Sequence, residues 1–102
     1  MKIKFLIYEE FEEYLFKKLT PTEERIYRVL LFYAMREINE IVKISQQDIA
    51  QNAHISIKTV IRSLKKLAEK EFIEIEKQKQ VLGHYNSYKL LIIPVFEGSI
   101  VF

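Results

Sequence analysis

Two helix-start signals lie close together near the middle of the chain, and their spacing constrains its fold more than any other feature. Ser45 is a residue type favoured at helix N-caps, which predicts a short helix over 46–53. Ser56 is a second N-cap residue and predicts a longer helix over 57–70. Residues 54–55 form the tight turn between them. The sequence therefore predicts two successive helices joined by a tight turn.

The second of these helices has two different faces. Its apolar residues follow the spacing of a buried helical face: Val60, Leu64, Leu67 and Ala68. The residues expected to lie away from this face can hold a phosphate or contact a base edge: Lys58, Thr59, Arg62, Ser63 and Lys66. No acid occurs among them, and Glu69 enters only in the last turn. This pattern alone fits either an ordinary solvated helix face or a helix that binds a DNA groove.

The charge of the chain is unevenly distributed. Its net charge is only +2, but residues 1–40 carry 7 basic and 8 acidic side chains, whereas residues 41–102 carry 9 and 6. Within 54–70 there are five basic residues and one acid. A local basic stripe is better evidence for an anionic partner than the total charge is.

A third helix is predicted ahead of this pair. In the segment "TPTE", Thr20 can act as the N-cap, Pro21 fits the first helical position, and Glu23 completes a capping box. We expect this helix to span 21–38. Its stretch "RIYRVLLFYAM" is apolar nearly all round, so more than one side should be covered. The domain core would cover one side, and the N-terminal arm or a second subunit the other.

Strands are expected after the helices and near the start of the chain. The stretch "FIEIEK" (72–77) alternates apolar and polar residues, and "YKLLII" (88–93) would return beside it as the second strand of a β-hairpin. We expect Pro94 to end that strand. The apolar tail after it would pack on the core or on a partner. A short strand over 2–8 and a helix over 9–19 would form an N-terminal arm.

The stretch "SQQDIAQNAHISIKTVIRSLKKLAEKEFIEIEK" resembles the winged helix-turn-helix family of DNA-binding domains. The resemblance covers roughly residues 20–92. The segment "LTPTEERIYRVLLFYAMRE" is also similar to the first helix of phage and plasmid replication initiators and, less specifically, to small viral and archaeal regulators. The resemblance implies an α+β fold with a three-helix core, a C-terminal β-hairpin wing and an N-terminal strand/helix arm. The implied division is an arm (1–19), the winged domain (20–93) and a tail (94–102).

The resemblance also implies where DNA would bind. The recognition helix (56–70) would lie in the major groove, and the wing (72–93) would reach the backbone or the minor groove. The residues implied to face DNA are Ser45, Gln46, Ser56, Ile57, Lys58, Thr59, Arg62, Ser63, Lys66, Lys77, Lys79 and His84. The family often has Gly at the turn where this chain has His54. That position usually needs a left-handed backbone, which His tolerates.

The sequence offers little for other classes of function. It has no Gly-rich phosphate loop, HExxH or GxSxG motif, so we expect no enzyme, no cofactor and no small-molecule substrate. Two His without Cys are too few for a zinc site. The sequence has no run of 18 apolar residues, which argues against a membrane span, and no signal peptide is evident. We expect a cytoplasmic protein, associated with the nucleoid or within a host cell.

Three functions remain open at this stage. The first is a transcriptional regulator that binds double-stranded DNA as a homodimer through the first long helix and the N-terminal arm. The second is a DNA replication-initiation accessory or origin-binding protein. The third is a winged helix used as a protein-interaction module.

Overall fold

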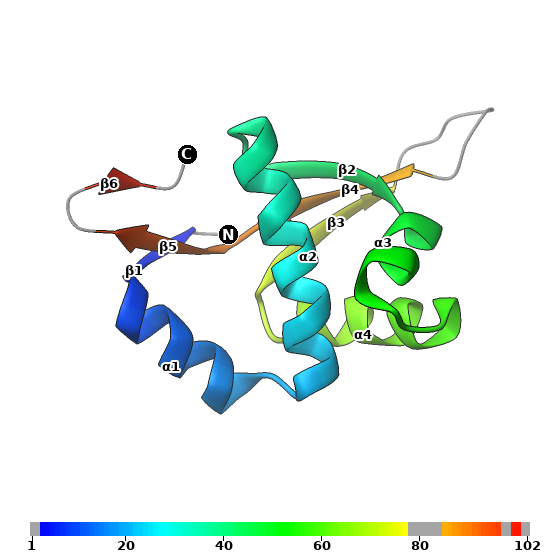
Figure 1. Ribbon diagram of the computed structural model, residues 1–102, viewed down its shortest axis with the longest axis horizontal. Helices are drawn as coiled ribbons and strands as arrows, with labels where there is room; N and C mark the ends of the chain where they lie inside the picture. The colour runs from blue at the N-terminus through cyan, green and yellow to red at the C-terminus, as the bar shows by residue number, and fades with distance from the viewer. Residues whose placement is uncertain (1–2, 78–84, 97–98, 101–102) are drawn as a thin grey trace.

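The computed structural model describes residues 3–77, 85–96 and 99–100, and this part of the chain forms four helices and six strands (Figure 1). In chain order these are β1 (Lys4–Ile7), α1 (Tyr8–Lys18), α2 (Pro21–Glu37), β2 (Ile41–Ser45), α3 (Gln46–Ala53), α4 (Ile57–Glu69), β3 (Ile73–Lys77), β4 (Tyr85–Leu90), β5 (Ile92–Phe96) and β6 (Ser99–Ile100). The predicted α+β winged helix is confirmed.

Helices α2, α3 and α4 pack on one another and on a three-stranded antiparallel sheet of order β2-β4-β3 (Figure 1). Their apolar faces meet in one core, in which Leu30, Ile49 and Leu67 are fully buried. Helix α1 joins the same core through Phe11 and Leu15. The predicted arm helix therefore packs directly against the winged domain.

The helix starts are held by the predicted caps. At α2, the Thr20 side chain accepts a hydrogen bond from the Glu23 backbone N–H (3.2 Å), and the Glu23 carboxylate accepts one from the Thr20 N–H (3.0 Å). At α3, the Ser45 hydroxyl accepts from the Asp48 N–H (3.0 Å). These bonds satisfy backbone donors that have no partner within the helix, which is why the predicted starts of these helices were correct.

The expectation that Pro94 ends the last hairpin strand is wrong. After β4 the chain continues as β5, and Pro94 lies buried inside it, opposite Leu6 of β1. Strands β1 and β5 pair in parallel, within a second sheet of order β1-β5-β6. In the described residues β6 pairs only with Val95 and Phe96, so Pro94 breaks no ladder bond shown on that side.

Lys70 connects the end of α4 to α1 and α2. Its ammonium donates to the Glu23 carboxylate (2.5 Å) and to the Lys18 carbonyl oxygen (2.9 Å). Burial by itself raises the pKa of Glu23, but the hydrogen bonds from Lys70 and Thr20 outweigh it and hold the pKa below its ordinary value. One lysine thus fixes the C-terminal end of α4 to the start of α2.

We expect Lys70→Met to lower the free energy of unfolding at neutral pH by about 1–3 kcal/mol, because it leaves a buried carboxylate without its cation. Since the pKa of Glu23 is lowered in the folded state, the stability that the ion pair contributes is present above the pKa that Glu23 has in the unfolded chain. This contribution is lost as the pH falls through the folded-state pKa. Urea unfolding at neutral and acidic pH measures both effects. Lys17→Met, in an ion pair exposed on both sides, is the control and should cause no measurable loss. Equal stability of the Lys70 variant and the unmodified chain would contradict the stabilising role of the Lys70–Glu23 ion pair.

Candidate nucleic-acid interface

The turn between α3 and α4 has the geometry that the sequence predicts. His54 adopts a left-handed backbone (φ 57°, ψ 46°), the conformation that favours Gly but that His tolerates. The Ile55 N–H donates to the Ala50 carbonyl (3.0 Å), which closes the end of α3. The chain therefore makes the tight turn that sets α4 across α3 without a glycine.

Ser56 caps the start of α4, as predicted. Its hydroxyl accepts a hydrogen bond from the Thr59 N–H (3.3 Å), and the two hydroxyl oxygens lie 2.9 Å apart. Ser56 is exposed and Thr59 is half-buried. This helix end therefore presents two hydroxyl groups and the positive end of the helix dipole to solvent, a suitable environment for a phosphate.

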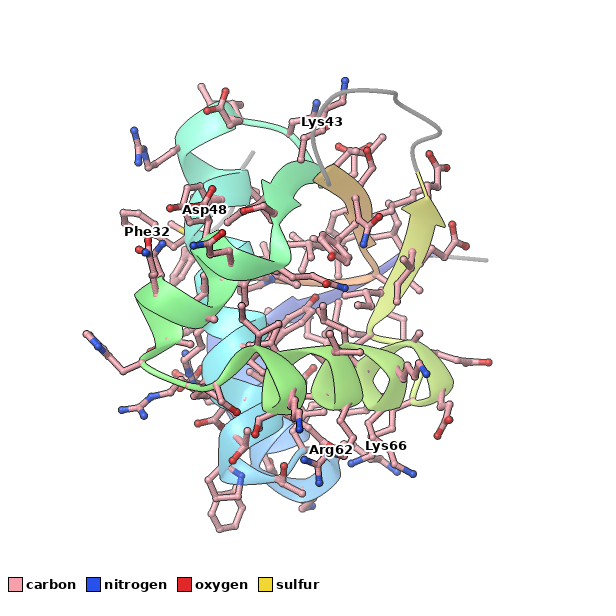
Figure 2. All side chains as sticks on the ribbon, turned by 90° about the vertical axis from the view of Figure 1, so that its right-hand side faces the viewer. Phe32, Lys43, Asp48, Arg62 and Lys66 are labelled. Carbon is pink, nitrogen blue, oxygen red and sulfur yellow. The ribbon has the colours of Figure 1, made fainter. Side chains whose placement is uncertain are left out.

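A basic face runs along the exposed side of α4. We call this the α4 basic face, and it consists of four exposed cationic side chains: Lys58, Arg62, Lys65 and Lys66. Figure 2 shows Arg62 and Lys66 projecting from the same edge of α4. Within the described part of the chain, neither Lys58 nor Arg62 has an ion-pair partner, while Lys66 lies 3.5 Å from Glu69. Most of this positive charge is therefore available to an external anion.

The prediction that Ser63 lies away from the buried face is wrong. Its side chain is only 7 % exposed. Each residue of an α-helix advances by about 100°, so a residue three positions after Val60 returns to within about 60° of it. Ser63 consequently belongs to the side of α4 that packs inward, and it does not lie on the α4 basic face.

Sequence reasoning left two exposed residues of α4 out of the DNA-facing set. Lys65 is exposed, and Ile61 is 37 % exposed. The same helical geometry could have identified both, because each lies farther around the helix from Val60 than Ser63 does. The exposed face of α4 is thus wider than predicted and includes an apolar edge formed by Ile57 and Ile61.

The remaining predicted contacts lie on other elements. Ser45 and Gln46 are half-buried at the start of α3, where Ser45 caps the helix. Lys77 is the last residue of β3. Lys79 and His84 lie outside the described residues, as does the tip of the predicted wing.

Two other kinds of feature, metal sites and membrane-spanning helices, were searched for in the described residues. They contain no group of three or more His, Cys, Asp or Glu side chains that could hold a metal ion. No described helix is both long enough and apolar enough to cross a membrane.

Comparison with known proteins gives one match. The family model of the Crp-like helix-turn-helix domain matches residues 24–83, which is 60 of the 102 residues. The matched range runs from the first turn of α2 to beyond β3 and so includes α3, the turn and α4. No curated protein and no solved structure matches the chain.

Proposed function

Since the chain belongs to the Crp-like helix-turn-helix domain family, a family of DNA-binding domains, we propose that it binds double-stranded DNA sequence-specifically and regulates transcription. In this proposal α4 lies in the major groove, where an α-helix fits and each base pair presents a distinct pattern of donors and acceptors. The hairpin of β3 and β4 would contact the DNA backbone or the minor groove beside it.

The observation that carries the proposal is the α4 basic face. Four cations occupy successive turns on the exposed side of α4, and the only acid on that helix is Glu69 in its last turn. Lys58 and Arg62 lack ion-pair partners among the described residues, so they would not have to break such a pair to bind DNA. The guanidinium of Arg62 can donate two hydrogen bonds to the O6 and N7 atoms of one guanine.

Phosphate contacts would orient α4 in the groove. The Ser56–Thr59 hydroxyl pair at the start of α4 and the capped start of α3 at Ser45 and Gln46 both offer donors suited to phosphate oxygens. Lys58 and Lys66 would add charge along the helix. We assign base recognition mainly to Arg62 and backbone contacts mainly to these other groups.

We also propose that the protein acts as a homodimer. A single recognition helix contacts only a few base pairs, and a two-fold pair doubles the length of the site. Large apolar side chains remain exposed on the two elements predicted to form the interface: Phe16 of α1 (82 % exposed), and Phe32 (57 %) and Met35 (43 %) of α2. Burial of these side chains against a second copy would remove apolar area from water.

Selection of bound fragments from a random duplex pool, followed by titration at several salt concentrations, tests this function. We expect a palindromic site with half-sites about one helical turn apart, bound by two copies of the chain. The logarithm of affinity should fall by about 0.9 per logarithmic unit of salt for each phosphate neutralised. Lys66→Ala should reduce this slope by about one, whereas Lys17→Ala on α1 should leave it unchanged.

Other outcomes separate the alternatives. Direct repeats bound by single copies would contradict the dimer and favour an origin-binding protein. If duplex DNA is not bound even at low salt, the DNA-binding proposal is wrong and a protein-interaction module remains.

A further inference from the structure

We propose that Ile57 and Ile61 form a thymine-reading edge on α4, at which each side chain contacts the C5-methyl group of a thymine in the major groove. This inference rests on the proposed DNA-binding function and adds the base preference of the same helix. Ile57 is 44 % exposed and Ile61 is 37 % exposed. They lie one helical turn apart, so they share one edge of the helix.

These two side chains take no part in the apolar packing of the domain. Neither belongs to the apolar core or to the partly buried apolar residues packed against it. The core-facing side of α4 is formed by other apolar residues, which are buried: Val60, Leu64 and Leu67. An apolar edge on a helix that already buries its core face is consistent with a surface covered by a partner.

The neighbouring charges indicate that this partner is DNA. Lys58 and Lys65 lie three positions before and four positions after Ile61, so they neighbour it on the helix surface, and both are exposed cations without an ion-pair partner in the described residues. A second protein chain that covered the two isoleucines would also have to accommodate these positive charges. The major groove offers an apolar methyl group beside acceptor atoms and phosphates, which matches both parts of this surface.

The residue types on α4 favour contacts with thymine and guanine over contacts with adenine and cytosine. Adenine is usually read by Asn or Gln, and cytosine by Asp or Glu. Helix α4 has no Asn, Gln or Asp, and its one Glu lies in the last turn. Arg62 and the lysines suit guanine. An A·T pair can therefore be recognised by this helix through the methyl group of its thymine.

The shape of the surface next to Ile57 supports the same contact. Ile57 and Ile55 line a hollow at the junction of α3 and α4, together with His54 and Gln51. A methyl group that protrudes from the groove floor can enter this hollow and contact Ile57. Ile61 lies one turn farther along the helix, where it would meet a neighbouring base pair.

Replacement of thymine by deoxyuridine tests the inference, because it removes the methyl group and leaves every hydrogen-bonding atom in place. Each thymine of the selected duplex is replaced in turn, and the dissociation constant is measured by fluorescence anisotropy. We expect the dissociation constant to increase about fourfold when the thymine beside either isoleucine is replaced, which corresponds to the loss of one buried methyl group. In Ile61→Ala the penalty at one of these positions should disappear.

Ile41→Ala provides a matched control. Ile41 is also 37 % exposed but lies on β2, so its replacement should leave every deoxyuridine penalty unchanged. Thermal unfolding monitored by circular dichroism verifies that both variants are folded. If the duplex is bound but no thymine is sensitive, or if Ile61→Ala keeps all penalties, the inference is wrong while the proposed function stands. Absence of any duplex binding would overturn both.

Discussion

Arg62→Ala is expected to weaken binding of the selected DNA site by about 1–3 kcal/mol, or roughly fivefold to 150-fold, and to abolish the preference for guanine at one position. Arg62 is exposed near the middle of α4, and no described residue forms an ion pair with it. Its removal would therefore cost contacts with DNA and little within the folded protein. Repetition of the fragment selection with the variant measures both affinity and preference.

Two further variants make this result specific. Arg62→Lys keeps the charge but loses the paired donors, so it should retain most of the salt dependence and lose the guanine preference. Arg36→Ala removes the same side chain from the last turn of α2, where Arg36 stacks over Phe32 and Tyr33 at 5.8 and 5.9 Å from their ring centres. The guanine preference should persist in this variant. If Arg62→Ala changes neither affinity nor preference, α4 is not the helix that reads the bases.

The helices of the domain could be predicted closely because local signals determine where they begin. Thr20, Ser45 and Ser56 each precede a helix that starts at the following residue. A side-chain cap acts over three residues, so its effect is contained in the sequence that it caps. The left-handed turn at His54 is equally local, and it was expected from the family resemblance, since that position often holds Gly in the family.

The second sheet could not be predicted because its pairing is not local. Leu6 lies opposite Pro94 in a parallel pair, although the two residues come from opposite ends of the chain. When only the neighbouring residues are considered, a proline suggests that a strand ends. Its place inside β5 becomes clear only when the partner strand β1 is known. The continuous apolar sequence of β5 gives no sign of this partner.

The binding face was predicted in outline and was wrong in detail. The position of Ser63 shows the reason: a polar residue was assigned to the outer face by its chemistry, although helical geometry turns it inward. Ile61 is the opposite case, an apolar residue on an exposed edge. The contacts assigned to Lys79 and His84 remain predictions, since both residues lie outside the described part of the chain.

Tyr27→Phe is expected to lower the free energy of unfolding by about 2–4 kcal/mol, although it removes a single oxygen atom. The buried Tyr27 hydroxyl of α2 donates to the Ile92 carbonyl (2.7 Å) and accepts from the Ile92 N–H (3.2 Å). In a parallel pair, the backbone N–H and C=O groups of every second residue point towards the partner strand. Because the Lys4 N–H donates to the Leu91 carbonyl, the backbone of Ile92 faces away from β1.

The hydroxyl therefore replaces a strand partner at the point where the chain passes from β4 to β5. Without it, two buried backbone groups lose their hydrogen bonds, at about 1–3 kcal/mol for each, and the total loss is reduced because the variant no longer buries a polar hydroxyl. Urea unfolding measures the loss. Tyr33→Phe on the same helix is the control, because its hydroxyl accepts only an exposed bond from Asn52 (3.0 Å) and should contribute little. A loss for Tyr27→Phe no larger than that of the control would contradict this role.

The same hydroxyl predicts a loss of stability at high pH. Burial raises the pKa of Tyr27 above its ordinary value. The unfolded chain therefore releases this proton near pH 10, whereas the folded chain retains it. The stability is fully present below that pH and falls by up to about 1.4 kcal/mol per pH unit above it. Burial also raises the pKa of Tyr88, so Tyr27→Phe should flatten the alkaline decline without abolishing it. If the free energy of unfolding of the variant fell with pH as steeply as that of the unmodified chain, the hydroxyl of Tyr27 would be accessible to water and would not hold β5 in place.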